Sequence, residues 1–155
     1  MKIRLIAVGK RQPRWIEDGF QEYAKRLPKH LGFSLEEIAP GARSGQHAER
    51  AMLEEADRIA NRLGSNDRVI ALDEGGKLMS TRGLADAMSG WEREGDSVSL
   101  VIGGADGLHR NVLDQAHQRW SLSGLTLPHG LVRIVVAEAI YRAHSLNRNH
   151  PYHRA

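Results

Sequence analysis

Short apolar runs alternate with longer amphipathic stretches along the 155 residues of the chain. Apolar runs of four to eight residues between turn signals are typical of buried strands, and apolar residues recurring every three or four positions are typical of helices. The pattern predicts strands over Ile3–Val8, Phe33–Ile38, Arg68–Leu72, Val98–Ile102 and Trp120–Leu122. It predicts helices over residues 13–26, 48–63, 80–94, 110–118 and 129–147.

This alternation of strands and helices predicts an α/β fold, with a mostly parallel sheet and helices on both faces. The sequence contains no internal repeat, no low-complexity segment and no long linker, so we expect one domain over residues 1–155. Ser80 is suited to the N-cap of the third helix, and Gly64 to the C-terminal stop of the second.

The composition excludes several classes of chemistry. The chain has no cysteine, which rules out disulfides, iron–sulfur clusters and thiol nucleophiles and fits a cytoplasmic protein. No apolar stretch approaches the ~20 residues that span a bilayer. The first apolar run is interrupted by Arg4 and is too short for a signal peptide. A net charge of +3 permits a polyanionic partner without requiring one.

Three successive strands are followed by unusual segments, Leu72–Gly76, Gly103–Gly107 and Leu122–Pro128. In open α/β sheets, ligands bind at the carboxyl ends of the strands, and glycines let the backbone approach a ligand closely. The alternative is that these glycines make tight turns. No phosphate-binding motif is present. The three segments therefore predict a pocket built largely from backbone groups, which suits an adenosine better than a phosphate.

The last predicted helix and the tail after it are the other unusual features. The helix is apolar nearly all round, so we expect it to lie centrally in the fold or against a partner subunit. Glu138 and Arg142 are four residues apart and are expected to pair. The tail, Asn149–Arg154, is polar, aromatic and basic, which favours recognition of single-stranded RNA over a frayed terminus. Its two histidines lack a third ligand, so we expect no metal site.

Several motifs occur in a fixed order along the whole chain. They are Lys2–Gly9, Glu22–Arg26, Leu72-Asp73 with Gly76-Lys77, Ile102–Gly104 with Gly107, Trp120–Ser123, Leu125–His129, Val132-Arg133, Glu138, Tyr141–Ala143 and Tyr152–Arg154. In this set, at this spacing, the chain resembles the ribosomal RNA large subunit methyltransferase H family of SPOUT enzymes. Residues 39–46 match no motif of that family.

The resemblance implies a SPOUT-type C-terminal trefoil knot, a rare exception to unknotted topology, and a homodimer packed partly through the last helix. It implies S-adenosylmethionine as the methyl donor. The implied acceptor is N3 of a pseudouridine in large-subunit (23S) ribosomal RNA, with the ribosome as the expected setting. Neither a metal nor a membrane is implied.

The site residues that the resemblance implies fall into two sets. The family's cofactor contacts correspond to Leu72, Gly103, Leu122, Ser123, Gly124, Leu125, Thr126 and Leu127. The candidates for placing and polarising the base are His129, Arg142, Tyr152, His153 and Arg154. Nearby cations would lower the pKa of the acceptor N3–H and so favour the nucleophilic anion.

Two other functions are consistent with parts of the sequence. One is a non-catalytic RNA-binding factor in ribosome assembly, and the other is a regulator that binds an adenine nucleotide without methyl transfer. The glycine-containing loops favour the enzyme and the regulator over the assembly factor. The basic tail favours the enzyme and the assembly factor over the regulator.

Overall fold

A computed structural model describes residues 1–43 and 48–154, with the side chains of residues 153 and 154 excepted. The strands are β1 (Lys2–Val8), β2 (Ser34–Ile38), β3 (Arg68–Leu78), β4 (Ser97–Ile102) and β5 (Gln118–Ser121). The α-helices are α1 (Arg14–Ala24), α2 (Ala48–Ala60), α3 (Thr81–Glu94), α4 (Arg110–Gln115) and α5 (His129–Asn147). Two short 3₁₀ helices, η1 (Lys29–Leu31) and η2 (Pro151–Arg154), complete the fold.

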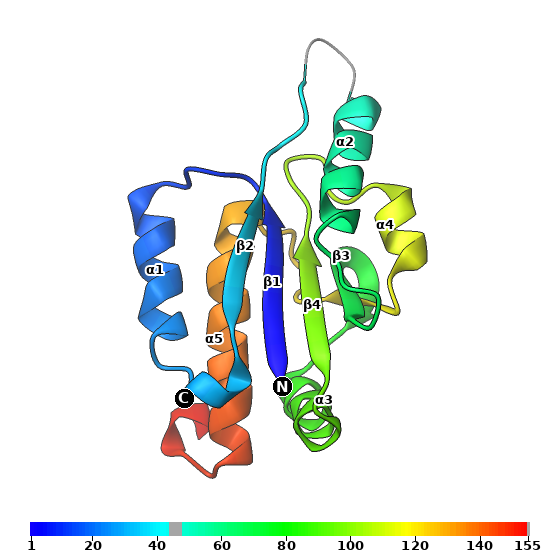
Figure 1. Cartoon of the computed structure of the whole chain (residues 1–155). Coiled ribbons are helices and arrows are strands. Elements are labelled where there is room, and N and C mark those ends of the chain that lie inside the picture. The colour runs from blue at the N-terminus through cyan, green and yellow to red at the C-terminus, as the bar shows by residue number, and fades with distance from the viewer. Residues whose placement is uncertain (44–47, 155) are drawn as a thin grey trace.

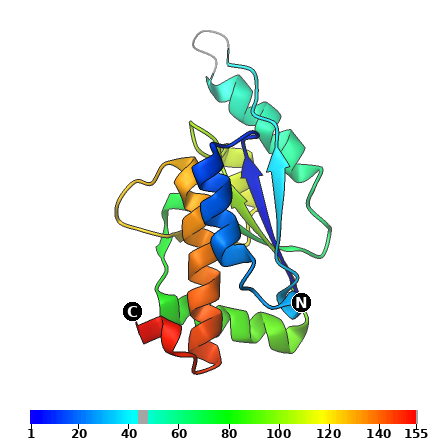
Figure 2. The ribbon, with the colours of Figure 1, turned by 90° about the vertical axis from the view of Figure 1, so that its left-hand side faces the viewer.

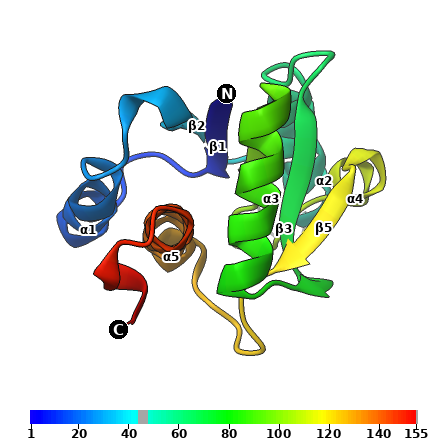
Figure 3. The ribbon, with the colours of Figure 1, turned by 90° about the horizontal axis from the view of Figure 1, so that it is seen from below.

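The five strands form one sheet in the order β2-β1-β4-β3-β5, and each of these pairings is parallel. The carboxyl ends of the strands therefore lie at a common edge (Figure 1). Helices α1, α3 and α5 cover one face, and α2 and α4 cover the other (Figure 3). The predicted parallel sheet with helices on both faces is confirmed. The trefoil knot stays a prediction of the family resemblance.

Successive side chains of a strand point to opposite faces of the sheet, so strand residues alternate between the two layers of helices. Along β1, Ile3 and Leu5 pack with α1, α3 and α5, whereas Ile6 and Val8 pack with α2 and α4. Helix α5 runs beside α1 (Figure 2), lies between α1 and α3 (Figure 3) and buries one side on the sheet. This central position explains much of its apolar sequence. Among the described residues, no helix is both long and apolar enough to cross a membrane.

The predicted loop Leu72–Gly76 is wrong, because β3 continues through it to Leu78. The strand slips its register against β5 here, so that Leu72 and Lys77 both pair with Trp120. A side chain on Gly76 would lie 2.6 Å from the backbone of Arg119. Glycine at 76 therefore permits close pairing of two strands, although an Asp-Glu-Gly-Gly sequence normally favours a turn.

Two predicted boundaries also shift. Helix α2 ends at Ala60, and Gly64 does not stop it but lies in a later turn in which its N–H donates to the Asp67 carboxylate. Strand β5 begins at Gln118 rather than at Trp120. The backbone N–H of His117 already donates to the carbonyl of Val69, which brings the chain into the sheet early and shortens α4. Ser80 is the N-cap of α3, as predicted, and accepts from the N–H of Gly83.

Candidate functional site

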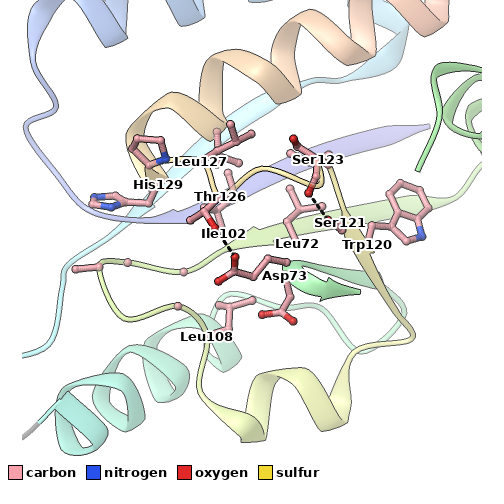
Figure 4. A pocket seen from close by; sticks show the side chains of 18 of the residues that line it. Leu72, Asp73, Ile102, Leu108, Trp120, Ser121, Ser123, Thr126, Leu127 and His129 are labelled. Carbon is pink, nitrogen blue, oxygen red and sulfur yellow. Dashed lines mark hydrogen bonds between the residues drawn. The ribbon is translucent and has the colours of Figure 1, made fainter. Parts of the chain in front are cut away.

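Three segments from the carboxyl edge of the sheet surround one pocket of about 590 Å³ (Figure 4). They are a segment within β3 and the segments that follow β4 and β5, the three strands that the sequence singled out. The start of α5 closes the remaining side. The lining residues are Leu72–Glu74, Ile102–Leu108, Trp120–Ser123, Leu125–His129 and Val132. The predicted pocket at the strand ends is therefore present in the structure.

Hydrogen bonds hold the segment 122–127 across the pocket. The hydroxyl of Thr126 donates to the carboxylate of Glu74 at 2.9 Å, which ties this segment to β3 (Figure 4). The hydroxyl of Ser121 donates to the carbonyl of Ser123, and the Ser123 hydroxyl accepts from the N–H of Leu125, both at 2.9 Å. Short polar side chains at 121, 123 and 126 therefore make the hydrogen bonds that hold this segment.

Glycines shape the wall that follows β4. A side chain on Gly103 would lie 2.4 Å from the carbonyl carbon of Gly107, because the chain turns back on itself here. Gly107 has φ +81°, a left-handed conformation that favours glycine. The turn itself therefore requires glycine at 103. Substituting valine there would displace the wall rather than simply obstruct a ligand.

A second cluster lies at the far end of α5. The guanidinium of Arg142 donates to the carboxylate of Glu138 at 2.7 Å and lies over the ring of Tyr152, 5.0 Å from its centroid. The Tyr152 hydroxyl donates to the same carboxylate at 3.2 Å. The ring of Tyr152 also packs on that of Tyr141, with 4.7 Å between centroids. The tail is therefore docked on α5 through Tyr152.

Burial, followed by the negative charge of Glu138, raises the pKa of Tyr152 to about 12. Its hydroxyl consequently stays protonated at neutral pH and can donate a hydrogen bond. Hydrogen bonding to Glu138 likewise raises the pKa of Arg142 and keeps its charge fixed. The predicted pairing of Glu138 with Arg142 is confirmed.

The pocket and this cluster are separated within one chain. His129 lies at the pocket and Arg142 lies 13 residues further along α5. At 1.5 Å of rise per residue, the two positions are roughly 20 Å apart. The tail lies near the opposite end of the strands from the pocket (Figure 1). One subunit therefore does not bring all the predicted catalytic residues together.

Residues 1–153 match a family described as "Predicted SPOUT methyltransferase". The chain belongs to the SPOUT methyltransferase family. Among curated proteins, it is 52% identical over 155 residues to the ribosomal RNA large subunit methyltransferase H of Ralstonia nicotianae, covering 99% of both chains. It is 46% identical over 155 residues to the protein of that name from Nitrosomonas eutropha, covering 100% of both. It thus falls within the methyltransferase H family that its motifs indicated.

Solved structures support the SPOUT fold at much lower identity. The chain matches a probable methyltransferase from Bordetella pertussis with a TM-score of 0.55 and 18% identity, covering 92% of this chain and 95% of that one. It matches a probable methylase family protein from Haemophilus influenzae with a TM-score of 0.54 and 16% identity, covering 97% and 69%. At these identities the likeness shows the fold alone.

In this SPOUT methyltransferase, all but one of the predicted cofactor residues line the pocket. The pocket lining contains Leu72, Gly103, Leu122, Ser123, Leu125, Thr126 and Leu127. Gly124 is not in that lining. Leu125 is 76% exposed and stands at the rim.

The predicted catalytic residues lie in two places. His129 lines the pocket, whereas Arg142 and Tyr152 belong to the distant cluster. The side chains of His153 and Arg154 lie outside the described residues, so their predicted roles stay predictions.

Sequence reasoning missed two acidic residues of this SPOUT pocket. Asp73 and Glu74 line it directly after Leu72, and Glu74 holds Thr126. They follow the buried part of β3, which was an available signal, but the sequence Asp-Glu-Gly-Gly favoured a turn. Among the described residues, no group of three or more histidine and carboxylate side chains could hold a metal ion.

Proposed function

We propose that this chain transfers the methyl group of S-adenosylmethionine to N3 of a pseudouridine in large-subunit ribosomal RNA. The observation that carries the proposal is the pocket formed by three strand-end segments in a chain that matches the SPOUT family over residues 1–153. The relatives named ribosomal RNA large subunit methyltransferase H support the choice of RNA. The test is transfer of a labelled methyl group from the cofactor to ribosomal RNA.

The pocket fits a nucleoside cofactor in size and chemistry. Its volume of about 590 Å³ is within the range of 300–1,000 Å³ typical of small-molecule sites. Gly103, Gly104 and Gly107 present backbone groups without intervening side chains. Asp73 and Glu74 offer carboxylates that can accept from hydroxyl or amino groups. When bound, S-adenosylmethionine supplies an electrophilic methyl group on its sulfonium.

The residues of the chain then have to place and polarise the acceptor base. N3–H must lose its proton to become nucleophilic, and nearby cations favour that loss. Arg142 carries a fixed positive charge, and the tail adds Arg154. Tyr152 has a pKa of about 12, so we assign it to hydrogen bonding or stacking rather than to proton abstraction. Holding donor and acceptor in place supplies much of the rate, ~7–11 kcal/mol in favourable cases.

A homodimer would complete this site. Opposite its buried side, α5 presents a stripe formed by Leu131, Val135, Glu138 and Arg142, which are half-buried in the single chain. Leu131 and Val135 supply an apolar surface that a second copy would cover, and Arg142 is near Tyr152 of the tail. We infer that the dimer packs through this stripe and brings the tail of one subunit to the pocket of the other.

The dimer yields a direct prediction. Val135→Lys places a charge in the middle of the stripe and is expected to convert a dimer into a monomer in light scattering at micromolar concentration, because an unpaired charge in an apolar interface is costly. Lys77→Ala, on the exposed part of β3, is the control and should remain a dimer. A monomeric mass for the unmodified chain would contradict the proposed dimer.

A further inference from the structure

A buried carboxylate outside the pocket lies against one of the pocket's walls. Glu55 is on α2, and its side chain is only 3% exposed. A buried carboxylate is costly unless it is paired and hydrogen-bonded. It accepts from the backbone N–H of Gly41 at 2.8 Å and from Nη1 of Arg43 at 2.8 Å. Both partners come from the segment that follows β2, so Glu55 fixes residues 41–43 against α2.

Arg43 continues this connection to the pocket. Its Nε donates to Oδ2 of Asp106 at 2.8 Å, while its Nη1 also donates to the carbonyl of Gly41 at 3.2 Å. Asp106 lies in the turn after β4 and lines the pocket. Arg43 is not in the lining of that pocket. Any effect of Arg43 on a ligand would therefore pass through Asp106 and the turn.

Glu55 also lies near Gly104, which is in the turn formed by residues 103–107. A side chain on Gly104 would lie 3.6 Å from Oε2 of Glu55 and 3.0 Å from Cγ1 of Val8. The turn is closed by a hydrogen bond from the N–H of Gly107 to the carbonyl of Gly104 at 3.1 Å. Val8 and Glu55 therefore leave little room for a side chain at Gly104, and Arg43 binds the turn through Asp106.

We propose that Glu55 and Arg43 are positioning residues for the pocket, because they hold residues 103–107 in the conformation that presents backbone to the ligand. The identity of that ligand rests on the proposed function. Preorganising a binding loop improves affinity by removing the cost of ordering it on binding. The proposal gives a role to residues 41–43, which belong to the segment that matched no family motif.

The test compares two identical substitutions in the full-length protein. Arg43→Met removes both the hydrogen bond to Asp106 and the ion pair with Glu55. Arg58→Met is the matched control, because Arg58 holds the carbonyls of Ala39 and Pro40 at 2.8 and 2.9 Å without contacting the turn. We expect Arg43→Met to speed amide hydrogen exchange over residues 103–108 of the ligand-free protein by about tenfold or more. Arg58→Met should leave exchange at those amides unchanged.

Affinity for S-adenosylhomocysteine, measured by calorimetry, provides the second readout. Arg43→Met should weaken it about tenfold, equivalent to about 1.4 kcal/mol. In methyl transfer, the KM for the cofactor should rise while kcat changes little. Asp106→Asn weakens the bond between Arg43 and Asp106 at its other partner. The double variant should be no worse than Arg43→Met alone, because Arg43→Met has already removed that bond.

The outcomes separate this proposal from the proposed function. Unchanged exchange over residues 103–108 in Arg43→Met overturns the positioning role, whatever the unmodified protein binds. Equal effects of Arg43→Met and Arg58→Met would also overturn it, since they would indicate a general loosening of the segment after β2. A wild-type chain that binds no S-adenosylhomocysteine contradicts the proposed function, and the exchange comparison still decides the role of Arg43.

Discussion

Deletion of residues 151–155 is expected to lower methyl transfer to ribosomal RNA by at least about 100-fold, comparable to losing a transition-state contact. The affinity for S-adenosylmethionine should stay close to that of the intact chain. The pocket is formed without the tail, whose Tyr152 contacts the far end of α5 instead. Single-turnover transfer and calorimetric titration of the same variant measure the two effects separately.

Point substitutions refine this prediction. Arg154→Ala should cost on the order of 100-fold in rate, and Arg154→Lys should recover only part of it, because the planar guanidinium can stack or bind phosphate in a bidentate manner. Tyr152→Phe removes the hydrogen bond to Glu138 but keeps the ring on Tyr141 and is the milder control. Full activity of the deletion variant on ribosomal substrate would show that the tail has no role in the reaction.

The second large effect is recovery of activity when two inactive variants share a dimer. Leu127→Trp fills the pocket with a larger side chain, and deletion of residues 151–155 removes the tail. Each variant alone should be inactive. In a mixed dimer, however, the intact pocket of one subunit meets the intact tail of the other. Coexpression in equal amounts should restore between about a quarter and a half of the wild-type rate, depending on how many sites work at once.

This mixing experiment tests whether the pocket of one subunit works with the tail of the other. Neither variant alone can test this. Tagging the two chains differently allows the mixed dimer to be purified before the assay. A mixed dimer with no more activity than its parents would contradict a site shared between subunits. The roughly 20 Å along α5 between His129 and Arg142 is the structural reason for expecting recovery.

Much of the fold followed from the sequence because its signals were local. The apolar helix over residues 129–147, the Ser80 cap and the presence of five strands depend on short-range patterns and were predicted correctly. The continuation of β3 to Leu78 was not predicted, since the register shift against Trp120 is set by a partner strand. Gly76 resembled a turn residue, yet its function is close approach between two backbones.

The pocket residues could be predicted because they lie at the ends of neighbouring strands. Contacts between residues distant in sequence could not be predicted. Seven of the eight expected cofactor residues line the pocket because they lie in β3 or directly after β4 and β5, and these three parallel strands are neighbours in the sheet. The link from Glu55 through Arg43 to Asp106 spans residues 51 positions apart and leaves no periodic signal. The docking of Tyr152 on Glu138 was likewise unpredicted, because terminal residues are normally frayed.

Methyl transfer to N3 of a pseudouridine in large-subunit ribosomal RNA can be tested directly by one measurement. The purified protein is incubated with S-adenosylmethionine carrying a tritiated methyl group and with ribosomes that lack the modification, and the nucleosides of the large-subunit RNA are then separated. We expect label in a single nucleoside, N3-methylpseudouridine, approaching one methyl group per large subunit. Absence of label from the RNA, or label in a different nucleoside, would contradict it.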